Sequence, residues 1–174
     1  MACTQTLSGI ASSCETNVGG IREVYICNFG DVTAYEVDST THMVDTLTMA
    51  SGKKFKVYHF KKNTSSMTST LNVDPANGVN FVQTDITMVF AKQDTTKRME
   101  IAALSLGEVT VMVLDSNGKY WIVGLDEFAA ATSGTAETGV SRTDGNKYTI
   151  TLTAYEASYP YEVDPTIVSA VIDS

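Results

Sequence analysis

The chain has 174 residues, 43% of them hydrophobic and only 18% charged, and a formal net charge of -8 at pH 7. This length allows one domain whose core needs neither disulfides nor a metal, and the low charge with many Ser and Thr favours a β-rich fold. The negative balance argues against tight binding of duplex nucleic acid, because phosphates are held by clustered Lys and Arg.

Residues 1–20 are small and polar, and they are expected to form an N-terminal arm without regular structure. The arm has neither the basic start nor the long apolar core of a secretory signal, so synthesis and assembly in the cytoplasm are expected. No apolar run approaches the roughly 20 residues of a membrane span, so no membrane contact is predicted. β-branched and aromatic residues then predict strands over 21–27, 32–37, 43–49 and 55–60.

The last of these strands is basic. Five of the 12 basic residues lie in or beside it, at Lys53, Lys54, Lys56, Lys61 and Lys62. Two interpretations are open: a solvated strand edge that resists pairing with foreign strands, or a docking surface for an acidic neighbour.

A hairpin is predicted over residues 66–90. Residues 66–73 alternate in character with the period of two that is typical of a strand. Residues 74–78 have the sequence Asp-Pro-Ala-Asn-Gly, in which Pro sets an early negative φ and Asn-Gly permits a late positive φ. The return strand, 80–90, places four large apolar residues on one face: Val82, Ile86, Met88 and Phe90.

The only helix expected is amphipathic and covers residues 95–106. Asp94 or Thr95 can cap its start, and Gly107 is expected to close it in the left-handed conformation. Apolar residues at helical spacing predict one buried stripe, formed by Met99, Ala102, Ala103 and Leu106 and widened by Ile101 and Leu104. A lone helix of about three turns is marginal in water, so we expect it to dock on the sheet.

The second half of the chain predicts further strands. Residues 109–114 are apolar on both faces, which indicates a central buried strand, and a tight turn with a short return strand follows within 115–123. Residues 126–146 lack apolar periodicity and are expected to be a long loop. Residues 147–155 alternate most clearly of all, and residues 158–174 form a tail with two prolines and an apolar patch.

The residues that could carry chemistry form no recognisable site. Cys3, Cys14 and Cys27 are odd in number and lack a CxxC spacing, which favours free thiols over disulfides or a zinc site. His42 and His59 lie apart from any arrangement that indicates a catalytic triad. The sequence therefore predicts no catalytic residue, no cofactor and no metal.

What the sequence offers instead is segments that a neighbouring subunit could order: the arm, the loop and the tail. Contacts of this kind between copies, around a ring and along its axis, would be heterologous. The candidate intersubunit contacts lie in the arm, the basic strand and the loop: Ile10, Lys54, Lys56, Lys61, Phe128, Ala129, Gly134 and Gly139.

Two stretches also share their placement of glycine and aromatic residues with one family. The first contains Leu7-Ser8-Gly9-Ile10, Cys14 and Gly19 to Ile26, and the second contains Trp121 to Glu127, Ser133 to Ala136 and Asp144 to Leu152. These stretches resemble the tail-tube and related virion proteins of tailed phages that infect Bacteroides-type bacteria.

That resemblance implies a β-sandwich or barrel with one flanking helix, in a subunit that forms rings, usually hexamers. The rings would stack into a hollow tube in the virion tail, in contact with other tail and neck proteins. DNA would pass through the tube during ejection without specific binding, which suits an acidic chain.

Other functions stay open. The polar stretch 126–146 and the tail would equally suit a tail-terminator, neck-ring or other connector subunit. A ligand-binding β-sandwich, such as a decoration module, belongs to a different class, and in it Tyr155, Tyr159 and Tyr161 would form a sugar-stacking surface. Size in solution separates these classes, since a binding module does not need to form rings.

Overall fold

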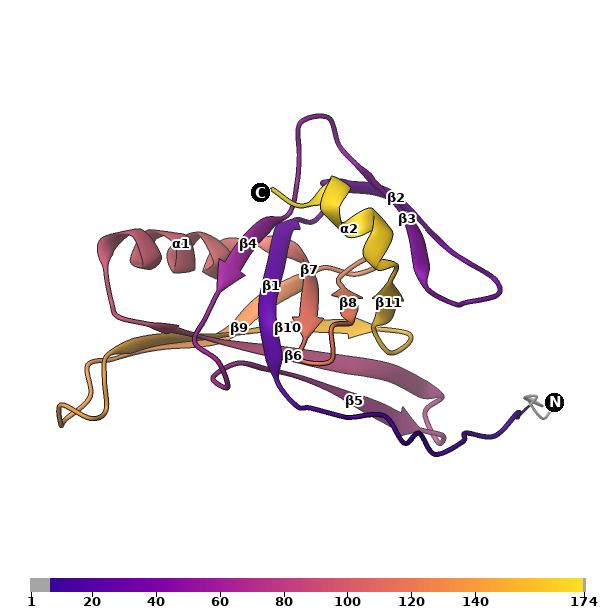
Figure 1. Cartoon of the computed structure of the whole chain (residues 1–174), viewed down its shortest axis with the longest axis horizontal. Coiled ribbons are helices and arrows are strands. Elements are labelled where there is room, and N and C mark those ends of the chain that lie inside the picture. The colour runs from indigo at the N-terminus through magenta and orange to yellow at the C-terminus, as the bar shows by residue number, and fades with distance from the viewer. Residues whose placement is uncertain (1–6, 174) are drawn as a thin grey trace.

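The computed structural model describes residues 7–173, which form eleven strands and two helices. The strands are β1 (Ile21–Asn28), β2 (Val32–Val37), β3 (Val44–Met49), β4 (Lys56–His59), β5 (Ser66–Asp74), β6 (Val79–Ala91), β7 (Glu108–Asp115), β8 (Tyr120–Val123), β9 (Ala129–Glu137), β10 (Lys147–Glu156) and β11 (Tyr161–Val163). The helices are α1 (Thr95–Leu106) and α2 (Pro165–Val171) (Figure 1).

All strands belong to one mixed sheet, whose order is β2-β3-β11-β8-β7-β9-β10-β6-β5. β1 lies off this path and pairs with both β7 and β4. Every pairing is antiparallel except the short parallel contact between β3 and β11. The sheet does not close on itself.

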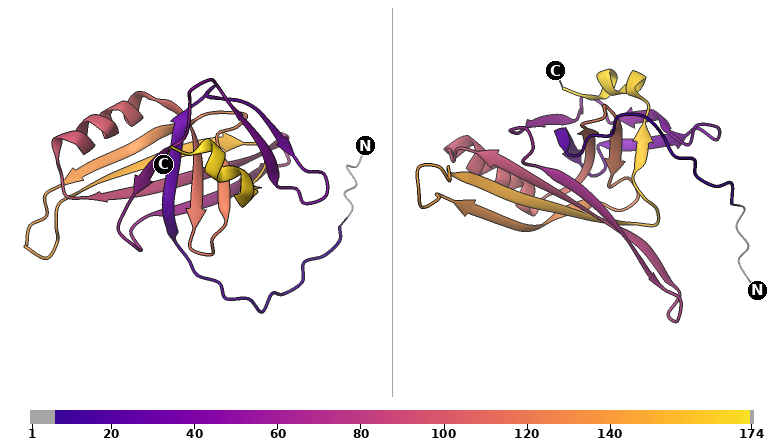
Figure 2. Two further views of the ribbon diagram at one scale, coloured as in Figure 1. Left: turned by 45° about the horizontal axis from the view of Figure 1, so that its top comes forward. Right: turned by 60° about the horizontal axis from the view of Figure 1, so that its bottom comes forward.

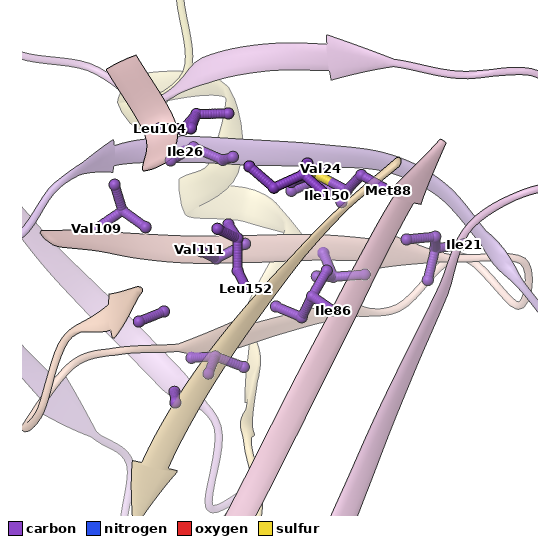
Figure 3. Packing of buried hydrophobic residues seen from close by; sticks show 14 of the residues in the cluster. Ile21, Val24, Ile26, Ile86, Met88, Leu104, Val109, Val111, Ile150 and Leu152 are labelled. Carbon is purple, nitrogen blue, oxygen red and sulfur yellow. The ribbon is translucent and has the colours of Figure 1, made fainter. Parts of the chain in front are cut away.

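The core lies on both faces of β1 and β7. One hydrophobic cluster lies between these strands, α1 and the inner face of β6 and β10, and Figure 3 shows its side chains gathered between the two sets of strands. A second cluster on the opposite face of β1 and β7 is closed by β3, β11 and α2. The prediction that residues 109–114 form a buried central strand is confirmed, since Val109 to Val113 are all buried.

Four strands, β9, β10, β6 and β5, extend from this core as a long sheet whose hairpins project from the body (Figure 2). Its inner face carries the predicted apolar row Val82, Ile86, Met88 and Phe90, which is confirmed as buried. The turn at 74–78 is also confirmed: Asp74 accepts hydrogen bonds from the backbone of Ala76 and Asn77, and Gly78 has a φ of 67°.

The limits of α1 and its cap are confirmed, since Asp94 accepts a hydrogen bond of 2.8 Å from the Lys97 backbone N–H. The predicted closing conformation is wrong, because Gly107 is extended, with φ -86° and ψ 144°. From there the chain passes straight into β7, so no left-handed residue is needed.

The predicted buried stripe of α1 is wrong for four of its six residues. Met99 is 63% exposed and Leu106 is 91% exposed, and Ala102 and Ala103 are exposed too. The two residues expected to widen the stripe are the ones that face the core: Leu104 is buried, and Ile101 packs against the first hydrophobic cluster. Apolar residues surround the second half of this helix, so their spacing could not identify the face that packs on the sheet.

Two expected irregular segments contain regular structure. The stretch 126–146 is not a long loop, because β9 occupies its centre and pairs with β10. The tail 158–174 holds β11 and the second helix, α2, which Asp164 caps by accepting a hydrogen bond from the Thr166 backbone N–H. Asp164 followed by Pro165 is a helix-start signal that the sequence did contain.

The prediction of a mainly β fold is therefore confirmed. The strands form one large, open, mixed sheet, and two short helices are present where one was expected. Residues 7–20 of the expected arm contain no strand or helix and only two isolated bends, at Glu15 and Gly20. Within residues 7–173 no helix is long and apolar enough to cross a membrane.

Candidate functional site

The outer face of the sheet β9-β10-β6-β5 is covered by hydroxyl groups. Its register aligns Thr87 with Thr151 and Thr135 with Thr149 across neighbouring strands. Thr87 and Thr151 share a hydrogen bond of 3.2 Å between their Oγ1 atoms, and Thr132 and Thr153 share one of 2.9 Å. These bonds link β9, β10 and β6 on the solvent-facing side of the sheet, where no hydrophobic core packs against the strands.

The charges of this face are few and mostly negative. Asp85 lies in its middle and accepts hydrogen bonds from Thr153 Oγ1 and from Gln83 Nε2, the latter at 3.0 Å. Lys147 Nζ lies 3.3 Å from Glu137 Oε2, so its charge is matched within the face. The described outer-face side chains therefore present hydroxyls, the Asp85 carboxylate and the apolar or aromatic groups of Val89, Phe81 and Tyr155, with no unmatched cation.

The same four strands end in two unpaired edges. Within residues 7–173, β5 pairs only with β6, and residues 131–137 of β9 pair only with β10. Neither β5 nor β9 contains Lys or Pro, the residues that commonly prevent an exposed edge from pairing with another chain. The β5 edge can thus accept a further strand, whereas the β9 edge lacks a strand partner but has α1 beside it (Figure 1).

The candidate contacts from the expected loop lie on or beside β9. Phe128 is 42% exposed and packs edge-on against Phe29, with ring centroids 5.9 Å apart. Ala129 is 1% exposed, so its side chain is enclosed by its own chain. Gly134 is exposed in the middle of β9 and pairs with Ile150.

Gly139 belongs to the turn between β9 and β10. Its φ is +73°, and a Cβ there would lie 2.7 Å from Asp144 Cβ, so the turn requires glycine. Asp144 closes this turn by accepting hydrogen bonds from the backbone N–H groups of Val140 and Ser141. Those donors hold the pKa of Asp144 below its usual range. The tip is exposed but structured by its own side chains.

The basic candidates surround the edge strand β4, which pairs only with β1 among the described strands. Lys54, Lys56 and Lys61 are exposed, and Lys56 makes an ion pair with Asp173. Ile10 lies in the arm and is fully exposed. The structure therefore places the eight candidates in separate regions and does not bring them together as one site.

Two hollows are present besides these surfaces. A groove of about 570 Å³ runs between α1 and the start of β4, and its lining includes Ile26, Lys54 and Ala103. A shallower hollow of about 420 Å³ is lined by Phe81, Tyr155 and Glu127 among others. The rings of Phe81 and Tyr155 are 5.9 Å apart and edge-on.

The half-buried carboxylate of Glu156 has a structural role. Glu156 is half-buried and accepts backbone hydrogen bonds of 3.0 and 3.1 Å from Gly124 and Leu125. Burial raises the pKa of Glu156, and these two donors partly oppose the shift.

His59 Nδ1 lies 3.3 Å from Glu23 Oε1 on the surface. Among residues 7–173 no group of three His, Cys, Asp or Glu side chains could hold a metal.

Sequence reasoning did not identify the hydroxyl face or the two edges. In the sequence, the hydroxyl face was marked by the alternation of Thr149, Thr151 and Thr153 with apolar residues. This alternation indicated a strand but did not indicate a function for its polar side. The edges had no signal in the sequence, because long-range pairing decides which strands become neighbours.

No family model and no curated protein sequence matches the chain.

Proposed function

We propose that this chain is a structural subunit that assembles into rings, and that the rings stack as the hollow tail tube of a tailed phage. The observation that carries the proposal is the sheet β9-β10-β6-β5, which has two different unpaired edges and a hydroxyl-covered face. The resemblance of residues 7–26 and 121–152 to tail-tube proteins gives the biological context.

The two edges support a ring. β5 of one copy can pair with β9 of the next, which is a head-to-tail contact, and such contacts generate a ring when the rotation closes. Because β5 and residues 131–137 of β9 lie at opposite sides of the four-strand part β9-β10-β6-β5, the ring would have a continuous β-lined wall. A hexamer is the symmetry that the resemblance implies.

The hydroxyl face supports a channel for DNA. If this face lines the lumen, the passing polyanion meets hydroxyls and the Asp85 carboxylate, and Lys147 is already paired with Glu137. A surface without unmatched cations gives phosphates nothing to bind, so DNA slides past without being held.

Negative-stain images and light scattering of the purified chain test the proposal. The expected result is rings or tubes with a central hole, with a mass that is a multiple of the 18.7 kDa subunit. A chain that stays monomeric at every concentration would contradict the proposal.

Edge variants make the test specific. Thr70→Lys on β5 and Thr135→Lys on β9 place charge on both unpaired edges, and together they should prevent ring formation while the monomer stays folded. Thr40→Lys, at an exposed turn far from both edges, is the matched control and should assemble normally. Assembly of the double edge variant would mean that the rings close through another surface.

The hollow beside Tyr155 favours one second candidate, a sugar-binding decoration module. Tyr155 is 48% exposed, pairs with Phe81 and lies beside Glu127, and sugars stack on such rings while hydrogen bonding to carboxylates. Tyr155→Ala should then abolish retention on an oligosaccharide array and leave the mass in solution unchanged.

A further inference from the structure

Three exposed apolar residues of helix α1 lie in or beside the groove. Ala103 is exposed and lines the groove, and the strongly exposed Met99 and Leu106 lie next to it around the helix. The floor of the groove is formed by Ile26, Leu104 and Val109 among others. We refer to the groove and these three residues of α1 as the α1 surface.

The α1 surface also has room for an extended segment of chain. The pairing of β4 with β1 ends at Lys56 and Ile26, while β1 continues along β7 to Asn28. Cys27 and Asn28 therefore have a β7 partner but no β4 partner, and both line the groove. A strand-like segment laid there would run beside backbone that β4 leaves unpaired.

The charges around the groove cancel. Its lining contains Lys53, Lys54 and Lys56 and also Asp31, Glu100 and Asp173. Lys53 Nζ lies 3.9 Å from Asp31, Lys56 pairs with Asp173, and Glu100 accepts a hydrogen bond from the Tyr58 hydroxyl. A segment of low net charge fits this lining better than a strongly acidic or a strongly basic partner does.

The N-terminal arm is such a segment. Leu7 is 90% exposed and Ile10 is fully exposed, and Glu15 is the only charged residue between positions 7 and 20. The described part of the arm is held to the body at its base, where Asn17 and Val18 hydrogen bond to Asn117 and the Gly20 carbonyl accepts a hydrogen bond from the Ser116 backbone N–H. Beyond that point it leads away from α1 in every view (Figures 1 and 2).

We propose that the α1 surface binds the N-terminal arm of a second copy of this chain, with Leu7 and Ile10 covering the groove and the exposed side of α1. The inference deepens the proposed function and rests on it, since a self-assembling subunit is the setting in which a second copy is always present.

The geometry favours a second copy over the chain's own arm. The arm leaves β1 at Gly20, beside the β7–β8 turn, whereas the groove lies at the other end of β1, beside Asn28. Residues 7–19 run away from their own groove (Figures 1 and 2), so the arm would have to reverse its course to cover it. Arm and α1 surface are different patches, so the contact is heterologous and repeats from copy to copy.

Cross-linking between isotope-labelled and unlabelled chains tests the choice of partner. A photoreactive benzoyl-phenylalanine in place of Ile10 is expected to cross-link to peptides of α1 and the groove. In a 1:1 mixture about half of these cross-linked pairs should join a labelled chain to an unlabelled one. Pairs that join only chains of one label would show that the arm covers its own chain and would overturn the inference. The same probe in place of Val140, which is equally exposed on a distant turn, is the control.

Peptide binding tests the inference without requiring tubes. A fluorescent peptide of residues 7–20 should bind the full chain carrying Leu7→Ser and Ile10→Ser, which cannot use its own arm. Adding Leu106→Asp and Ala103→Glu to that chain should weaken binding at least tenfold, and the peptide with both serine changes should not bind. Binding that survives the α1 changes, or no binding, would overturn the inference even if rings form. Binding without rings would leave the inference standing and contradict the proposed tube.

Discussion

At the scale of single residues, Glu156 shows how this chain uses a half-buried charge. Its carboxylate ties the end of β10 to Gly124 and Leu125 after β8, so it joins strands that are far apart in sequence. Burial raises the pKa of Glu156 above its value in the unfolded chain. The folded chain therefore holds a proton that the unfolded chain releases, and this residue's contribution to stability falls as pH rises through the folded pKa.

We predict that Glu156→Gln removes this pH dependence. The amide oxygen can still accept from both backbone donors, and the cost of burying a charge disappears. Relative to the variant, the wild type should lose free energy of unfolding as pH rises from about 4 to 8, in urea titrations. Glu127→Gln, on an exposed neighbour, is the control. If the wild type instead gained free energy of unfolding relative to the variant over that pH range, the pKa of Glu156 would be lowered by folding and the prediction would be wrong.

The described cysteines should differ in reactivity. Burial, with a contribution from the Asp31 charge, raises the pKa of the Cys27 thiol to about 12, whereas Cys14 is exposed on the arm. Since the thiolate is the nucleophile, iodoacetamide at pH 8 should modify Cys14 at least roughly tenfold faster than Cys27. Peptide mapping by mass spectrometry measures both rates, and in urea they should converge. Equal rates in the folded chain would place Cys27 at the surface. Cys3 lies outside the described residues.

At the scale of elements, strands with alternating, β-branched or aromatic residues could be predicted, and a strand of small residues could not. Residues 147–155 and 80–90 alternate, and both became strands close to the expected limits. β9 consists of Ala, Ser, Thr and Gly with a final Glu, so no large side chain marks its buried side, and only pairing with β10 makes it a strand. The hydroxyl face and the unpaired edges depend on which strands become neighbours, and local sequence does not contain that information.

The exposed side of α1 leads to a prediction about stability. Leu106→Asp should leave the monomer folded, because the side chain is 91% exposed and the charge stays in water. Leu104→Asp should unfold it, since Leu104 lies in the first hydrophobic cluster and an unpaired buried charge costs several kcal/mol. Circular dichroism during thermal unfolding measures both variants. Unfolding of both would mean that Leu106 packs on the sheet.

The β9–β10 hairpin leads to a prediction about proteolysis. Elastase cleaves after small apolar residues, which occur both within β9, at Ala130 and Ala136, and at the exposed turn, at Val140. Cleavage of the monomer should occur at Val140 and not within β9, because a paired strand does not enter a protease site. Mass spectrometry of the first fragments identifies the cut. Early cleavage at Ala130 would show that β9 opens in solution.

At the scale of the whole molecule, the unpaired strand edges, the N-terminal arm and the α1 surface lie in different places. The unpaired edges of β5 and of residues 131–137 of β9 lie at the two sides of the four-strand part β9-β10-β6-β5, which suits contacts around a ring. The arm leaves one end of β1 and the α1 surface lies near the other, which suits contacts between layers. If both proposals hold, ring closure and ring stacking use separate surfaces and can be disrupted one at a time.

We therefore predict that a chain lacking residues 1–16 forms rings that do not stack. The deletion keeps Asn17 and Val18, whose hydrogen bonds to Asn117 hold the base of the arm, and it removes the exposed Leu7 and Ile10. The midpoint of thermal unfolding of the dilute monomer should stay unchanged, since the deleted described residues bury nothing in the core. Negative-stain images should show single rings in place of tubes. Tubes of normal length would mean that stacking uses another surface, and a monomer that melts earlier would show that the arm contributes to the fold.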